Sequence, residues 1–167
     1  MRVWYKNAVI YELDVETFQD SNGDGIGDFA GLTDRLEYLA ALGVTCLWLN
    51  PFYPTPNRDN GYDVTDYSGI NPEYGALEDL VELVVEARER GVRILLDLPL
   101  NHSSDRHPWF QNAVASPGAE RRQWYCWREE DPGWTQPWSS SPTWHPLGGQ
   151  YYYGLFTHSM PDLNLAN

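Results

Sequence analysis

The stretch LTDRLEYLAALGVTCLWLN, residues 32–50, joins a helical pattern to a strand pattern through one glycine. Leucines recur in its first part at intervals of three or four residues, at Leu32, Leu36, Leu39 and Leu42. This spacing predicts an amphipathic helix that ends at Gly43. The run VTCLWLN that follows is short and continuously apolar, which is typical of a strand buried on both faces. A helix that leads directly into a buried strand predicts an α/β fold.

The same two patterns recur on either side of this stretch. AVIYELDV, residues 8–15, predicts a first strand, and VRILLDLPL, residues 92–100, predicts a third strand that is buried. ALEDLVELVVEARERG, residues 76–91, predicts a second helix whose apolar stripe consists of Leu77, Leu80, Val81, Val84 and Ala87. The resulting order is β-α-β-α-β, with short turns from helix to strand and long loops from strand to helix. It predicts a parallel sheet covered by helices.

A polar cluster follows each of the three expected strands. DSNGDGIGD, residues 20–28, comes just after the first strand, PNRDNGYD, residues 56–63, follows the second, and NHSSD, residues 101–105, follows the third. The carboxyl ends of parallel strands meet at one edge of the sheet, and ligands bind at that edge in such folds. We therefore expect the functional site there.

The loop DSNGDGIGD has the spacing of a metal-binding loop. Side-chain oxygens alternate along it at Asp20, Asn22 and Asp24. Gly25 stands where the chain must turn sharply, and Ile26 at the seventh position offers its carbonyl to a hard cation such as calcium. The loop is not an EF-hand, because the twelfth position holds a glycine where that motif needs a glutamate. The alternative is an Asx- and glycine-rich surface turn without an ion.

Asp59, Tyr62 and His102 come from separate loops at the same expected edge of the sheet. A carboxylate can hold a sugar diol through two charge-assisted hydrogen bonds. A tyrosine ring can support the sugar, and an imidazole can donate to a hydroxyl whose charge changes during reaction. Each residue also has a structural alternative, since Asp59 can shape the DNGYD turn, Tyr62 can belong to the core and His102 can be a structural hydrogen-bonding group.

Composition excludes several classes of protein. The 167 residues carry a net charge of −13, whereas binding to nucleic acid needs clustered Lys and Arg. No apolar run approaches the roughly 18 residues that would span a bilayer. The N-terminal stretch MRVWYKNAVIY has neither a long apolar segment nor a small-residue cleavage site, so no signal peptide is expected. Two cysteines do not make a disulfide framework, and a cytoplasmic location fits these observations.

The chain changes character after His102. From 103 to about 162 it is rich in Trp, Pro, Ser and Gly, without a long helix or clear strands, which indicates an inserted subdomain. Aromatic residues make up 14% of the chain and gather between Trp124 and Phe156. Flat aromatic faces suit the apolar faces of sugar rings, but aromatics can equally form the small core of a loop-rich insertion. Composition leaves both interpretations open.

Four segments together resemble a known family. In order and spacing, DSNGDGIGDFAGLTDRLEYLAALGVTCLWLNPFYP, DNGYDVTDY, DLPLNH and MPDLN are similar to the alpha-amylase family, glycoside hydrolase family 13, above all to its trehalose synthase and oligo-alpha-glucosidase branch. The resemblance implies the N-terminal part of a TIM (β/α)8 barrel, strands one to three, with a B subdomain inserted after strand three. Residues 1–102 would form the first β/α units, 103–162 the B subdomain, and 163–167 the return towards the barrel.

The resemblance also implies roles for single residues. A calcium ion would be held by Asp20, Asn22, Asp24, Asp28 and the carbonyl of Ile26. The terminal glucosyl unit of an alpha-linked gluco-oligosaccharide or disaccharide would contact Asp59, Tyr62, His102 and Phe156. Asp97, Asn101 and Asp162 would belong to structural motifs of the family. Many members of this branch have glutamine where Met160 stands, which leaves the subfamily open.

None of the carboxylates in this chain matches a catalytic acid of the family. A retaining glycosidase needs a nucleophilic carboxylate and an acid/base carboxyl about 5–5.5 Å apart. The family has them after strands four and five, with a third acid after strand seven. We therefore expect the N-terminal segment of an alpha-glucan- or alpha-glucoside-active enzyme, inactive alone and partnered by the remaining barrel. The alternatives are a non-catalytic carbohydrate- or calcium-binding module and a purely structural fragment.

Overall fold

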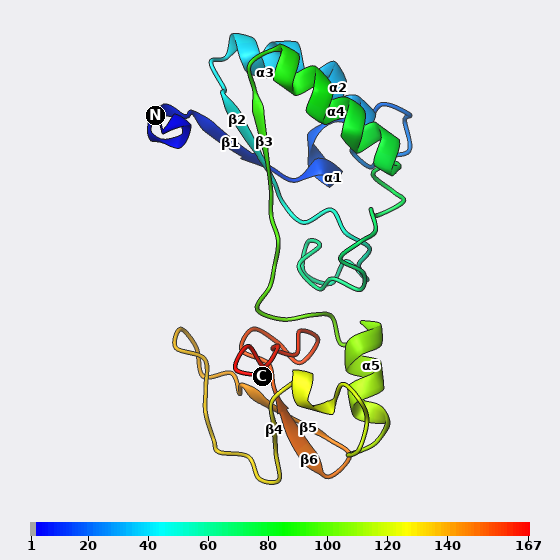
Figure 1. The fold of residues 1–167 in the computed structure, drawn as a ribbon, viewed down its shortest axis with the longest axis vertical. Helices are drawn as coiled ribbons and strands as arrows, with labels where there is room; N and C mark the ends of the chain where they lie inside the picture. The colour runs from blue at the N-terminus through cyan, green and yellow to red at the C-terminus, as the bar shows by residue number, and fades with distance from the viewer. Residues whose placement is uncertain (1–2) are drawn as a thin grey trace. The chain divides into compact units, whose positions relative to one another are not determined.

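The computed structural model describes residues 3–167, which form two compact units (Figure 1). The first unit comprises the chain up to Pro54 and Ser68–Leu98. The second comprises Thr55–Tyr67 and Pro99–Asn167. Among these residues no helix has the length and apolar character needed to cross a bilayer. The sequence-based division at 102 and 162 concerns a complete barrel and stays a prediction.

The first unit contains a parallel sheet with the strand order β1-β2-β3. Its strands are β1 (Ile10–Leu13), β2 (Cys46–Leu49) and β3 (Arg93–Leu96). The register places Leu13, Leu49 and Leu96 side by side at the carboxyl ends of the three strands. The predicted β-α-β-α-β order and the parallel sheet are therefore confirmed, and the loops after the strands leave from one edge.

Helices lie along one side of this sheet in Figure 1. They are α2 (Phe29–Asp34), α3 (Leu36–Ala41) and α4 (Leu77–Glu89), preceded by a 3-10 turn, η1 (Trp4–Asn7), and a one-turn helix, α1 (Val15–Phe18). Leucines from the helices and from β2 form the buried core, with Phe29 packed edge-on against Phe52 at 5.4 Å between ring centroids. Because α1 lies between β1 and the DSNGDGIGD loop, the first strand ends earlier than predicted.

The prediction of a single helix over residues 32–43 is wrong. The segment forms two short helices, α2 and α3, and Arg35 between them has φ −97° and ψ 0°. The Arg35 N–H bonds to the carbonyl of Leu32 at 3.1 Å, which tightens the last turn of α2 and redirects the chain. As a result Leu42 lies outside the buried stripe and is 58% exposed, while Gly43 ends the segment at φ +93° as predicted.

The apolar stripe predicted for the second helix is also wrong in part. In α4 the buried residues are Leu80, Leu83 and Ala87, whereas Leu77, Val81 and Val84 are exposed. The helix carries two adjacent apolar stripes, and only one of them faces the sheet in this chain. Periodicity alone could not decide which stripe is covered, because both satisfy the helical spacing.

The third strand is not buried as predicted. Leu96 in β3 is 48% exposed, and Trp48 in the central strand β2 is 37% exposed. β3 has a hydrogen-bonded neighbour on one side only, and the face of the sheet that carries Trp48 has no layer over it among the described residues. β3 therefore has the composition of a strand buried on both faces, but the described residues do not include the elements that would cover it.

The second unit is built around an antiparallel sheet with the order β4-β6-β5. The strands are β4 (Trp127–Arg128), β6 (Gln150–Tyr153) and β5 (Trp144–Leu147), accompanied by α5 (Pro108–Ala115) and a 3-10 turn, η2 (Arg122–Trp124). Phe110, Ala113, Tyr125 and Tyr152 form its buried core. The expectation of no clear strands between 103 and 162 is wrong, because QYYY and WHPL carry large side chains on both faces and so lack apolar–polar alternation.

Candidate functional site

The loop between Thr55 and Asp63 is shaped by residues that tolerate a left-handed backbone. Asn57, Asn60 and Gly61 have φ values of 54°, 46° and 85°. Asparagine and glycine adopt this region at lower cost than other residues. The turn is closed by a hydrogen bond of 2.9 Å from the Tyr62 N–H to the Asp59 carbonyl, and it leaves the Asp59 side chain exposed.

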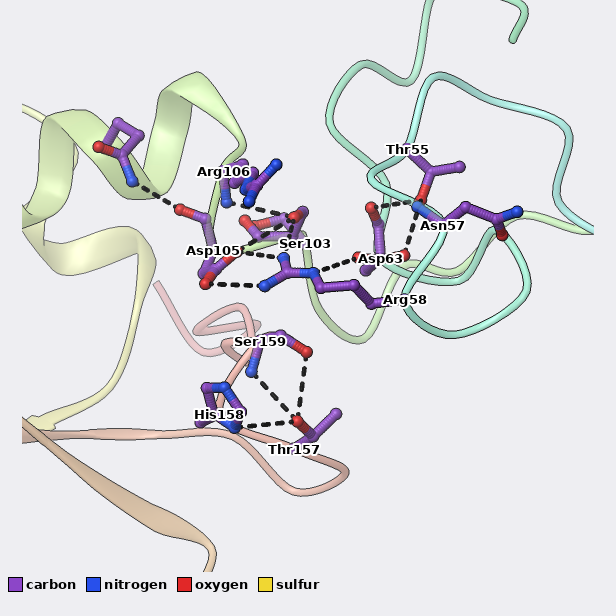
Figure 2. A network of polar contacts seen from close by, with 12 residues as sticks. Thr55, Asn57, Arg58, Asp63, Ser103, Asp105, Arg106, Thr157, His158 and Ser159 are labelled. Atoms are coloured by element: carbon purple, nitrogen blue, oxygen red, sulfur yellow. Dashed lines mark hydrogen bonds and ion pairs between the residues drawn. The ribbon is translucent and has the colours of Figure 1, made fainter. Parts of the chain in front are cut away.

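Arg58 ties this loop to the segment before α5 (Figure 2). Its Nε lies 3.1 Å from Oδ2 of Asp63, and its terminal nitrogens form a two-pronged contact with the carboxylate of Asp105. The Asp63 side chain is fully buried and also accepts a hydrogen bond of 2.6 Å from Oγ1 of Thr55. The hydrogen bond to Asp105, followed by that to Asp63, holds the pKa of Arg58 above its ordinary value. The loop is therefore fixed by a charged network.

A pocket of about 420 Å³ opens beside this network. Asp59 and Phe156 line it together with Arg58, Gln136, Trp138, Thr157, His158, Ser159 and Met160. The carboxylate of Asp59 has no hydrogen-bond partner among residues 3–167, so its oxygens are available to a ligand. Two of the four residues predicted to contact a sugar thus share one pocket.

His102, another residue predicted to contact a sugar, does not line the pocket itself but contacts one of its wall residues, Phe156. It is only 4% exposed, its ring lies edge-on to Phe156 at 5.4 Å between centroids, and its Nε2 is 3.1 Å from the carbonyl of Tyr62. A carbonyl only accepts, so this contact assigns the ring proton to Nε2. The other nitrogen, Nδ1, is buried and has no partner among the described residues. The ring of Tyr62 is not part of the pocket wall.

Trp138 and Gln136 belong to the site but were not predicted. The Trp138 ring lies 5.8 Å from Phe156, and the Gln136 amide donates to the Phe156 carbonyl at 2.6 Å. Trp138 falls in the aromatic-rich stretch, whose composition alone does not distinguish a ligand site from a small core. His158, which carries no sequence pattern around it, also lines the pocket. Its neighbours Thr157 and Ser159 bond to each other through their hydroxyls at 3.2 Å (Figure 2).

The three residues predicted to belong to structural motifs, Asp97, Asn101 and Asp162, all take part in hydrogen bonds. Asp162 is buried and accepts hydrogen bonds from the Leu155 N–H, at 3.1 Å, and from the side chain of Asn101. Burial raises the pKa of the Asp162 carboxyl, and these hydrogen bonds oppose the rise. Asp97 belongs to the first unit, where its carbonyl accepts a hydrogen bond of 3.1 Å from the Tyr53 hydroxyl.

The DSNGDGIGD loop of the first unit is held by its own side chains. The Asp20 carboxylate accepts hydrogen bonds from the N–H groups of Asn22, Gly23 and Gly25 at 2.7–3.0 Å. These donors, Gly25 first, hold the pKa of Asp20 below its ordinary value. Asp24 accepts from the N–H of Ile26 at 2.8 Å. Gly27 packs so closely that an added Cβ would lie 2.0 Å from a backbone oxygen of α1, which fixes the loop against that helix.

The loop has the oxygen ligands of a calcium site, but its carboxylates already accept hydrogen bonds from groups of this chain. Asp28 caps α2 through a bond of 2.6 Å from the Gly31 N–H and also accepts from the N–H and hydroxyl of Ser21. Among residues 3–167 no three His, Cys, Asp or Glu side chains are gathered to hold a metal ion. A carboxylate has about four lone-pair directions, so Asp20, Asp24 and Asp28 keep capacity for a cation together with the oxygens of Asn22 and Ile26.

The chain was compared with known protein families and with curated proteins. A family model described as the catalytic domain of alpha-amylase matches residues 13–167. A probable alpha-glucosidase from Rhizobium meliloti is 44% identical over 173 residues, covering 99% of this chain and 31% of that protein. A trehalose synthase from Pimelobacter sp. is 44% identical over 173 residues, covering 98% of this chain and 30% of its own length.

Solved structures give the same result. A mutant of MutB, crystallised with the substrate sucrose, superposes with a TM-score of 0.91 at 42% identity, covering 99% of this chain and 31% of that one. Trehalose-6-phosphate hydrolase from Bacillus licheniformis superposes with a TM-score of 0.91 at 36% identity, covering 98% and 31%.

The chain thus spans about a third of the length of the relatives it matches. Its strands β1, β2 and β3 correspond to the N-terminal part of the TIM barrel of these enzymes, as predicted. A family model that covers residues 13–167 and relatives at 44% identity lead to one conclusion. This chain belongs to the alpha-amylase family.

Proposed function

We propose that this chain supplies the glucosyl-binding part of an alpha-glucoside-active enzyme with a retaining mechanism. The observation that carries the proposal is the exposed, unpaired Asp59 carboxylate in a pocket walled by Phe156. The relatives support it, because they include a probable alpha-glucosidase, a glucan 1,6-alpha-glucosidase and a trehalose synthase. The MutB structures contain glucose and sucrose.

The pocket offers complementary groups to one terminal glucosyl unit. Asp59 accepts hydrogen bonds from two adjacent hydroxyls, and a charged acceptor makes each of these stronger than a neutral one. The rings of Phe156 and Trp138 cover the apolar side of the sugar. His102 fixes Phe156 edge-on and keeps the Tyr62 segment in place through its Nε2 contact. These groups bind and orient the sugar but do not break the glycosidic bond.

Bond cleavage in the whole enzyme is assigned to carboxyl groups outside this chain. In a retaining mechanism a carboxylate attacks the anomeric carbon while a carboxylic acid protonates the leaving oxygen, giving a covalent glucosyl-enzyme. Water or a second sugar then takes the glucosyl unit. The family's nucleophilic aspartate and acid/base glutamate follow strands four and five, whereas the parallel sheet described here has three strands. The remaining barrel is therefore the proposed partner of this chain.

The 167-residue chain should bind maltose without cleaving it. We expect no release of glucose from maltose, sucrose or starch, together with a shift of the Trp138 indole signal in the NMR spectrum when maltose is added. Asp59→Asn should weaken the affinity read from that shift, because it removes the charged acceptor. Glu130→Gln, an exposed change outside the pocket, serves as the matched control.

Two results would contradict this proposal. Reproducible cleavage of any of the three substrates would show that the chain carries its own catalytic acids. A Trp138 signal that does not move with maltose, in a chain whose indole signals are well dispersed, would remove the sugar site and favour the calcium-binding module.

We further propose that the DSNGDGIGD loop binds one calcium ion through Asp20, Asn22, Asp24, Asp28 and the Ile26 carbonyl. When bound, the ion would neutralise the acidic loop and hold its turns. The backbone donors that lower the pKa of Asp20 keep this carboxylate ionised, and ready for a cation, below the pH at which an ordinary carboxyl is protonated.

Chelation should therefore lower the melting temperature of the chain. A ligand present at a hundred times its Kd stabilises the folded state by about 2.7 kcal/mol, and a domain of this size melts about 2–4 °C lower for each kcal/mol lost. We expect a decrease of roughly 5–10 °C when EGTA is added. Asp24→Asn keeps an acceptor for the Ile26 N–H but removes the charge, so this variant should not respond to EGTA. Asp131→Asn should respond as the unmodified chain does, and an EGTA-insensitive unmodified chain would refute the site.

A further inference from the structure

The second unit contains a larger groove, of about 960 Å³, that shares no lining residue with the pocket around Asp59. It includes the face of the antiparallel sheet that α5 does not cover. Trp127 and Tyr152 are paired in the register, and both rings contact Phe110 of α5. Because successive residues of a strand point to opposite faces, their neighbours Arg128 and Tyr153 point away from α5.

A cationic and aromatic cluster lines this groove. The Arg128 guanidinium lies 5.7 Å from the ring centroid of Trp134 and 5.3 Å from that of Trp144. Trp134 is 53% exposed, so a large part of its surface is open to a ligand. Over the described residues the side chain of Arg128 has no ion pair or hydrogen bond, and its five N–H donors are therefore unused.

Several polar groups of the groove lack partners. Trp144 is only 5% exposed, yet its indole Nε1 has no hydrogen-bond partner among residues 3–167. Leaving a buried donor unpaired costs about 1–3 kcal/mol, so such groups are rare unless a water or ligand completes them. The side-chain amides of Gln123 and Asn167 also line the groove without a bond within the described part of the chain.

We propose that this groove is a second carbohydrate-binding site, which takes a neutral alpha-glucan chain and takes no part in bond cleavage. Indole surfaces, amides that both donate and accept, and unused guanidinium donors match a polyhydroxylated ring. The volume lies within the range of about 300–1,000 Å³ that is usual for small-molecule sites. The choice of glucan as ligand rests on the proposed function, whereas the site rests on the groove itself.

Charge argues against an anionic ligand in the groove. Glu129, Glu130 and Asp131 follow Arg128 directly, and the chain as a whole carries a net charge of −13. The lining itself holds Arg122 and Arg128 and no acidic side chain, but Arg122 is already bonded to the Ala113 carbonyl and to the side chain of Gln150. The net negative charge of the chain opposes the approach of a phosphate or carboxylate, whereas an uncharged sugar is not subject to this repulsion. The Arg128 guanidinium therefore serves as a hydrogen-bond donor to hydroxyls.

The test is an NMR titration of the full 167-residue chain with maltoheptaose, with the eight indole N–H signals as reporters. We expect the Trp144 signal to shift, because a sugar bound in the groove changes the surroundings of this indole ring. Trp134→Ala should weaken the affinity read from that signal at least about fivefold. Arg128→Gln, at an exposed position, should weaken it as well and serves if the tryptophan variant fails to fold. Asp59→Asn should leave the Trp144 shift intact.

Three outcomes would overturn the second site. The first is a Trp144 signal that maltoheptaose does not move. The second is a shift caused by inorganic phosphate and not by the glucan. The third is loss of the Trp144 shift in Asp59→Asn, which would make the groove dependent on the pocket. The proposed function is judged separately by the Trp138 signal, so either proposal can fail while the other stands.

Discussion

Asp59→Ala is expected to lower kcat/KM for alpha-glucosides by at least about two orders of magnitude in the enzyme that carries this chain. The Asp59 carboxylate lies in the pocket with both oxygens free, and each hydrogen bond to a charged group contributes about 1.5–3 kcal/mol. Two such bonds to adjacent hydroxyls would be lost together. The measurement is steady-state kinetics with maltose and isomaltose as substrates.

Two matched variants separate binding from folding in this experiment. Asp59→Asn keeps the size of the side chain and removes its charge, so it should lie between the alanine variant and the unmodified enzyme. Glu130→Gln removes one exposed charge elsewhere in the same unit and should leave kcat/KM unchanged. Unaltered kinetics in Asp59→Ala, with the melting temperature preserved, would reject the role of Asp59 in sugar binding.

The parallel sheet could be predicted from sequence because each of its elements has a local signal. VTCLWLN is short and apolar throughout, and a glycine with positive φ precedes it, at Gly43. Such signals depend on neighbouring residues only, and they do not require knowledge of what packs against the element. The parallel arrangement was then predicted from the alternation of strands and helices along the chain.

The errors concern surfaces whose cover is decided elsewhere. The two apolar stripes of α4 have the same helical spacing. Only one of them, formed by Leu80, Leu83 and Ala87, is covered in this chain. β3 has the composition of a buried strand, yet Leu96 is exposed because no further element lies beside it among the described residues. Local sequence reports the tendency to be buried and does not report which partner is present.

Some residues of the candidate site were predicted because they follow expected strands, Phe156 was predicted only through the family resemblance, and others were missed. Asp59 and His102 stand in polar clusters at the ends of expected strands, so topology pointed to them. Trp138 and Gln136 lie in a stretch without periodicity, and only the three-dimensional contacts with Phe156 bring them to the pocket. Composition identified that stretch as aromatic-rich but could not tell a sugar platform from a core.

Arg58 shows how the charged network and the pocket depend on each other. It lines the pocket, and it pairs with the fully buried Asp63 and with the partly exposed Asp105. Asp59, its neighbour in sequence, is exposed at the end of the same turn. The position of the Asp59 carboxylate, for which we propose sugar binding, is therefore set by a salt bridge whose buried member cannot be solvated by water.

Arg58→Ala should destabilise the second unit by about 3 kcal/mol, because it leaves the buried Asp63 carboxylate without its cation. Urea denaturation followed by tryptophan fluorescence measures this, since only Trp4 and Trp48 lie outside that unit. Asp105→Asn, which removes the partly exposed partner, should cost no more than about 1 kcal/mol. Adding Asp63→Asn to the Arg58 variant should recover part of the loss, because no unpaired charge then remains buried. A cost for Arg58→Ala that equals the cost for Asp105→Asn would show that the buried pair does not hold the loop.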